Sequence, residues 1–152
     1  MQTYKVALFG HRDLCAHLKV EEGLRAIFEE MLSLKPYIEV YVGRNGEFDV
    51  FASSVIKGMI TKGRDDITLT LVLPYKSKDI EYYEKYYNDI IIPECAEKAY
   101  PKIAITLKNR WMVENSDLVI CYVERENGGA YEALKYAKRL GKSVINLADG
   151  KK

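Results

Sequence analysis

Short apolar runs alternate with segments of helical periodicity along most of this chain. Such short, continuous apolar runs are typical of strands that are buried on both faces of a sheet. The sequence predicts strands at Tyr4–Phe9, Ile38–Val42, Ile67–Leu73, Asp89–Ile92, Leu118–Val123 and Ser143–Leu147. It predicts helices at Val20–Leu34, Phe48–Met59, Ile103–Asn115 and Gly128–Leu140, and a helix or an ordered lid at Asp79–Asn88.

Strands that alternate with helices in this way indicate an α/β fold. We expect a three-layer, Rossmann-like domain with a mostly parallel sheet and helices on both faces. The chain has 152 residues, close to the usual domain size of about 100–150, so residues 1–152 are expected to form a single domain. Right-handed crossovers place the β-to-α loops at the carboxyl edge of the sheet, where open α/β sheets bind their ligands.

The charge balance argues against a protein that coats nucleic acid. The 23 Lys and Arg residues nearly cancel the 22 Asp and Glu residues, which leaves a formal net charge of +1, whereas such binding needs a strongly basic face. We therefore expect no nucleic-acid partner, although a small nucleotide needs only a few local donors. No apolar run approaches the roughly 20 residues of a membrane span, so no membrane partner is expected.

The three cysteines, Cys15, Cys95 and Cys121, are scattered and include no CxxC pair. An odd, scattered set suits a reducing compartment, and each cysteine is expected to be a small core residue. Only His11 and His17 could join them as ligands, so we expect no metal site. The N-terminal segment leads directly into a strand-like run, without the layout of a signal peptide, which predicts a cytoplasmic protein.

Glycines and charged residues follow the first two predicted strands. The first loop combines a glycine, which allows close backbone approach, with an arginine that suits phosphate; a tight turn with a surface arginine is the structural alternative. The second loop opens a helix, whose N-terminus favours an anion, and its aspartate can accept hydrogen bonds from a ribose diol. The GxGxxG fingerprint is absent, and we expect no nicotinamide or other cofactor. The candidate ligand-binding residues of these loops are Gly10, His11, Arg12, Gly43, Arg44, Asn45, Gly46 and Asp49.

A Gly-Gly pair opens a predicted helix directly after the strand Leu118–Val123. A glycine-rich helix N-terminus binds phosphate through backbone N–H groups, although the pair can also serve only as a loop hinge. Arg110, in the preceding helix, can reach the same pocket or form a surface salt bridge. The candidate ligand-binding residues of this loop are Asn127, Gly128, Gly129 and Tyr131.

A tyrosine-rich segment follows the third predicted strand. The tyrosines at positions 82, 83, 86 and 87 fall at helical spacings. Such a stripe is most often packing, but tyrosine is also favoured at interfaces. Together with Pro74 and Tyr75, which are candidate ligand-binding residues, the segment can form a lid that stacks on a base.

These motifs together resemble the SLOG superfamily, a Rossmann-like group that includes the LOG phosphoribohydrolases, the DprA-type domains and the YpsA-like proteins. The resemblance covers nearly the whole chain. Within the superfamily, the chain most resembles a SLOG family of Firmicutes. The segment from Ser116 to Leu147 also resembles nucleoside 2-deoxyribosyltransferases. The motifs that carry the resemblance are Gly10 to Arg12, Gly43 to Asp49, Arg110 with Met112, Ser116-Asp117 before LVICYV, and Gly128-Gly129 before a helix with Ala137 and Gly141.

The resemblance implies a pocket for a nucleotide or a nucleotide-derived small molecule, in a homodimer or larger homo-oligomer. In LOG enzymes an arginine and a glutamate cleave the N-glycosidic bond, and Arg110 matches the arginine. The chain lacks the proline and the Gly-Thr pair of the LOG motif, so the glutamate position falls on Glu132 or on Ala133, depending on the direction of the alignment. One residue turns a helix by about 100°, so both positions cannot face the same substrate carbon.

The sequence therefore favours a module that binds a nucleotide or nucleotide-derived ligand as a sensor, because the pocket motifs are present while the catalytic motif is incomplete. The alternative is a nucleotide N-glycosidase or a 2-deoxyribosyltransferase-like enzyme, with Arg110 and Glu132 as catalytic residues. A third interpretation is a scaffold that oligomerises and keeps only a vestigial pocket.

Overall fold

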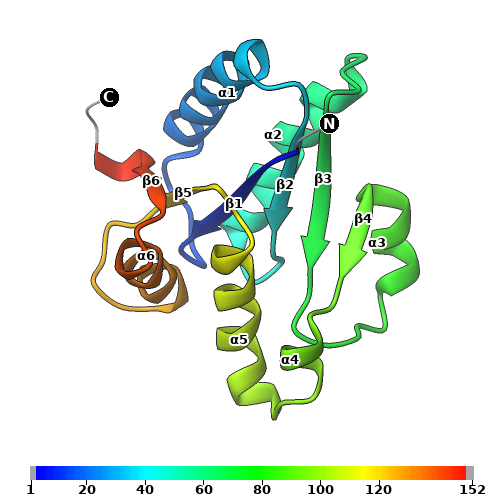
Figure 1. The fold of residues 1–152 in the computed structure, drawn as a ribbon, viewed down its shortest axis with the longest axis vertical. Coiled ribbons are helices and arrows are strands. Elements are labelled where there is room, and N and C mark those ends of the chain that lie inside the picture. Colours follow the sequence, from blue (N-terminus) through cyan, green and yellow to red (C-terminus); the bar gives the residue numbers. More distant parts are fainter. Residues whose placement is uncertain (1–2, 150–152) are drawn as a thin grey trace.

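The strands form one six-stranded sheet between two layers of helices (Figure 1). The computed structural model describes residues 3–149. The strand order is β4-β3-β2-β1-β5-β6, and every neighbouring pair is parallel. The predicted Rossmann-like α/β fold is confirmed. The strands are β1 (Tyr4–Gly10), β2 (Ile38–Val42), β3 (Ile67–Val72), β4 (Asp89–Ile91), β5 (Leu118–Tyr122) and β6 (Ser143–Asn146).

The helices follow the predicted order, with two short additions. Neither α4 nor the final 3-10 turn was predicted, since both are too short to show helical periodicity. The tyrosine-rich segment forms a helix, α3, as one of its two expected forms. The helices are α1 (His17–Leu34), α2 (Glu47–Thr61), α3 (Ile80–Tyr86), α4 (Glu94–Glu97), α5 (Pro101–Glu114), α6 (Gly129–Arg139) and the 3-10 turn η1 (Leu147–Asp149).

The central strand β1 supplies two separate cores. Val6 and Leu8 pack with the buried faces of α1 and α2 on one side of the sheet. Ala7 and Phe9 pack with α5 and α6 on the other side. Successive side chains of a strand point to opposite faces, so burial of both faces requires the continuous apolar run seen in the sequence.

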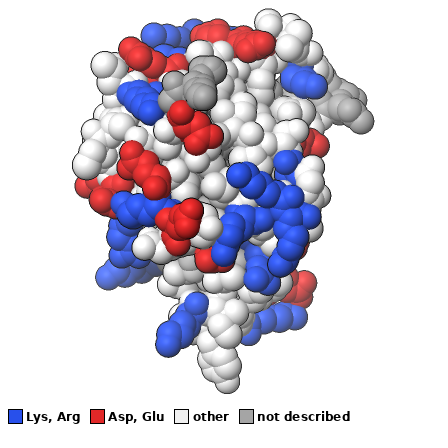
Figure 2. All heavy atoms as spheres, turned by 90° about the vertical axis from the view of Figure 1, so that its left-hand side faces the viewer, with Lys and Arg blue, Asp and Glu red and all other residues white. Residues whose placement is uncertain are grey.

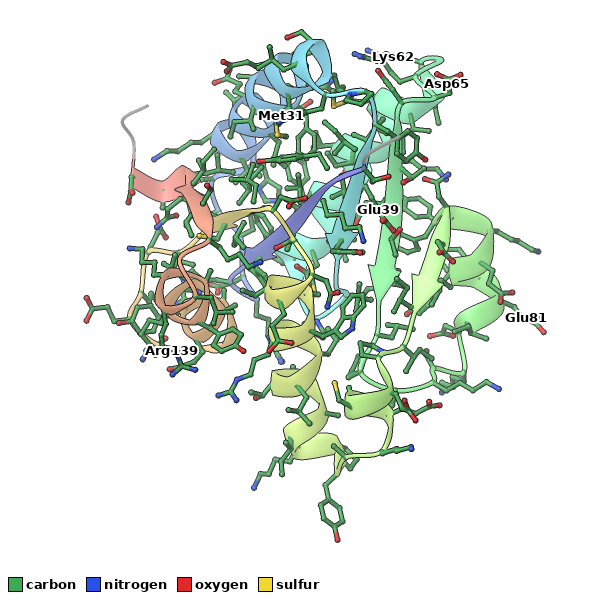
Figure 3. The ribbon with its side chains drawn as sticks, viewed as in Figure 1. Met31, Glu39, Lys62, Asp65, Glu81 and Arg139 are labelled. Atoms are coloured by element: carbon green, nitrogen blue, oxygen red, sulfur yellow. The ribbon has the colours of Figure 1, made fainter. Side chains whose placement is uncertain are left out.

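Charged side chains lie mainly around the outside of these layers, as Lys62, Asp65 and Glu81 do in Figure 3. The edge strand β6 is held by a side-chain amide. Asn146 accepts a hydrogen bond from the Val123 N–H and donates one to the Val123 carbonyl, both at 3.0 Å. This pair of bonds ties β6 to the loop that follows β5.

The prediction that all three cysteines are core residues was wrong for two of them. Cys121 is buried in β5, and burial raises the pKa of its thiol to about 12. Cys15 and Cys95 are exposed. Cys15 lies in the loop before α1, and Cys95 lies on the short helix α4. Neither the loop nor the short helix presents a broad face to the core.

Candidate functional site

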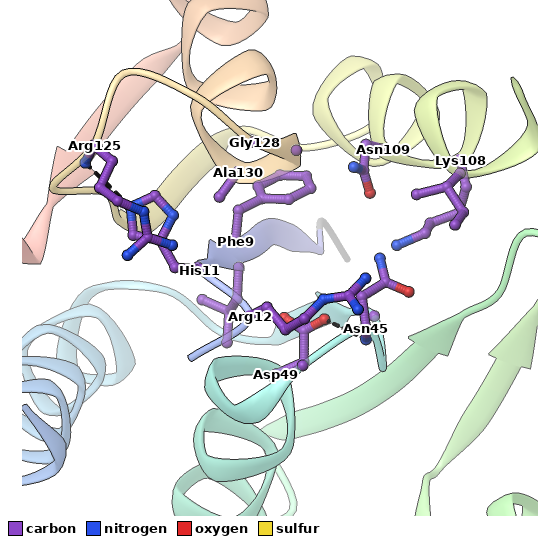
Figure 4. A pocket seen from close by; sticks show the side chains of 16 residues that line it. Phe9, His11, Arg12, Asn45, Asp49, Lys108, Asn109, Arg125, Gly128 and Ala130 are labelled. Atoms are coloured by element: carbon purple, nitrogen blue, oxygen red, sulfur yellow. Dashed lines mark hydrogen bonds between the residues drawn. The ribbon is translucent and has the colours of Figure 1, made fainter. Parts of the chain in front are cut away.

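A cavity of about 290 Å³ opens at the carboxyl ends of β1 and β2, between the first turns of α2 and α6 and the side of α5 (Figure 4). This is the edge of the sheet where the sequence predicted the site. Nine of the predicted ligand-binding residues line it, namely Gly10, His11, Arg12, Gly43, Asn45, Gly46, Asp49, Gly128 and Gly129. The other lining residues are Leu8, Phe9, Ile105, Lys108, Asn109, Arg125 and Ala130.

His11 joins the loop after β1 to the loop after β5. Its Nε2 atom accepts hydrogen bonds from the N–H groups of Glu124, at 2.9 Å, and Arg125, at 3.3 Å. Burial and the nearby charge of Arg125 lower the pKa of His11, which favours the neutral imidazole that these bonds require. His11 is therefore a clamp between two walls of the cavity, and its Nε2 lone pair is already occupied.

The loop before α2 is tied to the same wall. The Glu47 N–H donates to the Arg12 carbonyl at 2.7 Å, and the Glu47 carboxylate accepts from the Leu14 N–H at 2.8 Å. Within the loop, the Asn45 N–H donates to Asp49 Oδ2 at 2.9 Å. The backbone around Arg12 and Asn45 is thereby fixed before any ligand binds.

Lys108 is the unusual member of the cavity wall. It lies on α5 in the same stripe as Ala104 and Met112, and only 1% of its surface is exposed. Its Nζ atom points into the cavity (Figure 4), where a methyl group at Gly43 would lie 2.6 Å from it. Within residues 3–149, Nζ has no hydrogen-bond acceptor and no carboxylate within 4.0 Å.

Among the described residues that line this cavity, Asp49 is the one acidic side chain, and it is 7% exposed. Burial raises its pKa, while the charge of Lys108 and the bond from the Asn45 N–H act in the opposite direction. Burial likewise lowers the pKa of Lys108, and the charge of Asp49 opposes that shift. Burial therefore disfavours the charged form of each group, and the attraction between the two charges offsets this only in part.

The first turn of α6 closes the cavity from the other side. Gly128 precedes this helix with φ +92°, a left-handed conformation that glycine adopts at little cost. The N–H groups of Gly129, Ala130 and Tyr131 have no acceptor in the described part of the chain. The first N–H groups of a helix are free donors and carry the positive end of its dipole, so this wall favours an anion.

A second cavity, of about 470 Å³, lies beside the first between α5 and α6. The two cavities share Asn109 and Gly129. The residues predicted to be catalytic, Arg110 and Glu132, line this second cavity and not the first. Glu132 is exposed and pairs with Lys135 at 3.5 Å, whereas Ala133 is 4% exposed.

Five predicted ligand-binding residues lie outside the first cavity: Arg44, Pro74, Tyr75, Asn127 and Tyr131. The Arg44 side chain turns toward α3, where it donates to the Tyr87 hydroxyl at 3.1 Å and lies over the Tyr83 ring. The tyrosine segment thus packs on this arginine. Pro74 is buried, and Tyr75 is exposed away from the cavity wall.

Three polar residues of the wall were missed by the sequence prediction: Lys108, Asn109 and Arg125. For Lys108 a signal was present, because it stands between Ala104 and Met112 at the spacing of an apolar helix stripe. Arg125 follows β5 and pairs with Asp13 at 3.0 Å. For Asn109, one residue after Lys108, no pattern in the sequence indicates that it lies at the cavity.

Comparison with known proteins identifies the fold and not a family. No model of a known protein family matches the chain, and no curated protein sequence matches it. The structure is similar to DNA processing protein A (DprA) from Streptococcus pneumoniae, with a TM-score of 0.65 and 17% sequence identity. The match covers 93% of this chain and 49% of the DprA chain, so the chain spans about half the length of that protein. None of the helices within residues 3–149 is long and apolar enough to cross a membrane.

Proposed function

We propose that the first cavity binds the phosphate group of a nucleotide or nucleotide-derived small molecule, and that the protein is a sensor or binding module for this ligand. The observation that carries the proposal is the Lys108 ammonium group, which is buried at the cavity without an acceptor. A buried charge without a partner is unfavourable. A phosphate supplies both the opposite charge and the acceptor oxygens, in charge-assisted hydrogen bonds.

The groups around Lys108 support the same ligand class. The free N–H groups at the start of α6 face the cavity, as does the start of α2 at Gly46. Arg12 also lines the cavity, and its guanidinium has no partner among residues 3–149. Two helix N-termini and two cations therefore converge on a single cavity, which suits a phosphate.

Asp49 gives the cavity an acceptor for the sugar. A carboxylate repels a phosphate, so the phosphate binds on the side of Lys108 and α6. Asp49 Oδ2 holds only the Asn45 N–H, and a carboxylate has further acceptor sites for ribose hydroxyl groups. A volume of about 290 Å³ is at the lower end of ligand pockets, and we assign it to the phosphoribosyl part, with the base toward the opening.

The broader expectations remain predictions. The likeness to DprA agrees with the SLOG resemblance at the level of the fold. Membership of that superfamily, a single domain over residues 1–152, a homodimer or larger homo-oligomer, a cytoplasmic location and the lack of a nucleic-acid partner are proposed on the sequence alone. Because the neighbouring structure is named a DNA processing protein, a DNA oligonucleotide belongs in any binding test.

The glycosidase alternative has no structural observation in its favour. It needs Arg110 and Glu132 at the phosphoribosyl site, and both line the other cavity. Glu132 is paired with Lys135, and Ala133, the other aligned position, has no carboxylate. We therefore propose that the protein binds its ligand without cleaving it, and the recovery of intact ligand checks this.

The test is a thermal-shift screen with adenosine 5′-monophosphate, cyclic nucleotides, adenosine diphosphate ribose and a short DNA oligonucleotide. A ligand at a hundred times its Kd stabilises a protein by about 2.7 kcal/mol, which the screen detects. We expect a nucleotide to stabilise the protein and to be recovered intact by chromatography. Released free base would instead show N-glycosidase activity, and a shift with the oligonucleotide alone would contradict a small-molecule site.

Two lysines on the same helix make the screen specific for the cavity. Lys108→Met keeps the length and apolar stem of the side chain and removes its charge, and we expect the affinity for the nucleotide to fall at least tenfold. Lys102→Met removes an exposed charge of α5 that does not line the cavity, and it should leave the affinity unchanged. Equal affinity of the two variants would overturn the proposed function.

A further inference from the structure

We propose that the ligand carries a second anionic group, and that this group binds in the second cavity against the guanidinium groups of Arg110 and Arg139. The inference rests on the proposed function of the first cavity and extends it. Because Asn109 and Gly129 line both cavities, a ligand that fills the first can continue into the second past these two residues.

Both arginines lie against the same aromatic ring, that of Tyr136. The guanidinium carbons of Arg110 and Arg139 lie 5.2 Å and 5.0 Å from the centre of the Tyr136 ring. The Tyr136 hydroxyl donates to Glu114, which fixes the ring. Neither guanidinium has a carboxylate within 4.0 Å in the described part of the chain, so two planar cationic groups line one cavity without an ion pair. Such a pair favours a shared anion.

Asn109 marks the passage between the cavities. Its Oδ1 atom is buried and has no hydrogen-bond partner in the described part of the chain, and its Nδ2 atom lies 3.6 Å from the position of a methyl group on Gly129. Figure 4 shows the side chain beside Lys108 at the cavity. A buried acceptor without a donor is unfavourable. A hydroxyl or amino group of a ligand that crosses at this point supplies the donor.

The charge pattern selects this direction over the other opening of the first cavity. On that other side, a shallow surface is lined by as many acidic as basic side chains, Asp13 and Glu47 with Arg12 and Arg44, so it offers an anion no excess of positive charge. Among the described residues, the second cavity is lined by three basic side chains, Arg110, Lys135 and Arg139, and by one acidic side chain, Glu132, which is paired with Lys135. Figure 2 looks onto the α6 side of the molecule and shows Lys and Arg side chains gathered on it.

The test compares three adenine nucleotides by calorimetric titration: adenosine 5′-monophosphate, adenosine 3′,5′-bisphosphate and the 5′-phosphorylated dinucleotide pApA. The last two add a second anionic group to the first. We expect at least one of them to bind the natural protein about ten times more tightly than the monophosphate, because one additional charge-assisted contact contributes roughly that factor. The measured quantity is the ratio of two Kd values in the same protein, so any effect of a substitution on folding cancels.

The double variant Arg110→Gln with Arg139→Gln should bring this ratio close to one. Lys138→Gln is the matched control, because Lys138 is an exposed cation of α6 outside the second cavity, and it should leave the ratio unchanged. A monophosphate that binds while neither bis-anionic probe gains affinity would overturn this inference and leave the proposed function standing. A ratio that the double variant does not change would overturn it equally. Failure of all three nucleotides to bind would overturn the proposed function and this inference with it.

Discussion

Lys108 and Asp49 face the same cavity and are both almost fully buried, yet their charged groups do not come within the 4.0 Å of an ion pair. A methyl group at Gly43 would lie close to both, 2.6 Å from Nζ and 3.2 Å from Oδ2. Burial makes the charged form of each group less favourable than it is in water. The attraction between the two charges offsets this only in part. The cavity can therefore gain from a third charged partner, and several measurable properties follow.

The first prediction is that the protein takes up protons when a nucleotide binds. Burial lowers the pKa of Lys108 from its ordinary value of 10.5, and a phosphate beside Nζ raises it again. The same phosphate raises the pKa of Asp49 further, so both groups act in the same direction. Affinity for adenosine 5′-monophosphate should therefore decline as the pH rises through the lowered pKa of Lys108, in the range below 10.5.

Calorimetric titration in two buffers of different ionisation enthalpy measures this uptake. At pH 8.5 the phosphate, with a second pKa of about 6, is already fully ionised and contributes nothing. Lys108→Met should abolish the part of the uptake that comes from this ammonium group, and Lys102→Met should retain it. Tight binding without proton uptake at any alkaline pH would contradict the placement of the phosphate beside Lys108.

The second prediction separates backbone strain from ligand binding at two glycines. Gly128 and Gly141 both have positive φ, +92° and +76°, at opposite ends of α6. Alanine at either position should lower the free energy of unfolding by about 1 kcal/mol, because a Cβ disfavours this conformation. Only Gly128→Ala should also weaken nucleotide binding, since Gly128 lines the cavity and Gly141 does not. Urea unfolding and calorimetric titration measure the two effects, and equal affinity of both variants would argue against a phosphate at the start of α6.

The third prediction concerns stability in mild acid. The pKa of His11 is lowered from its ordinary value of 6.5, so below that pH the unfolded chain binds more protons at this residue than the folded one. The free energy of unfolding should therefore fall as the pH drops from about 7 toward the lowered pKa, and flatten below it. Urea unfolding between pH 7.5 and 5.5 measures the slope.

Two histidine variants test whether His11 causes this dependence of stability on pH. His11→Gln keeps an acceptor oxygen for the Glu124 and Arg125 N–H groups but removes the titrating ring, so its stability should be less sensitive to pH over this range. His17→Gln removes a histidine that has no part in this clamp and should retain the slope of the natural protein. A slope that survives in His11→Gln would show that other groups produce it.

The fourth prediction tests the close packing of β1 on α2. A methyl group at Gly10 would lie 2.1 Å from Cγ of Phe48, whose ring is fully buried. The ring cannot move without disturbing the core, so Gly10→Ala should lower the free energy of unfolding by about 1–3 kcal/mol. Gly58→Ala, inside α2 with open space around it, should instead add about 0.5–1 kcal/mol. A stable Gly10→Ala variant would show that the turn after β1 can rearrange.

The sequence was sufficient for the fold because its signals are local. The run Ile38–Val42 was predicted to the residue, and the strand at β5 differs by one residue from the prediction. In contrast, Lys108 was missed because a lysine is almost always solvated, and its burial depends on how α5 packs against β1 and β2. His11 was predicted at the cavity, but its role as a clamp was not, because its ring nitrogen accepts hydrogen bonds from N–H groups more than a hundred positions away.

The sequence also could not predict that Gly129 and Glu132 would line different parts of the site, since Glu132 lines only the second cavity. Both Gly129 and Glu132 lie in the first turn of α6, and a sequence shows only that they are near one another. Which cavity each of them faces is set by how α6 packs against the core through Ala130, Ala133 and Ala137. That packing turns Glu132 outward, away from the wall on which Asp49 lies.

The hydrogen bonds that the loop after β5 donates to His11 also bear on how the protein is made. The strand β1 lies between β2 and β5, and the cavity needs walls from both the first loop and the last helix. A nascent chain that has emerged only as far as β4 contains β1 and β2, but it lacks both the α5 wall and the α6 wall. Ligand binding is therefore a property of the chain after β5 and α6 have been synthesised and docked, and a ligand that reports on the cavity also reports that folding is complete.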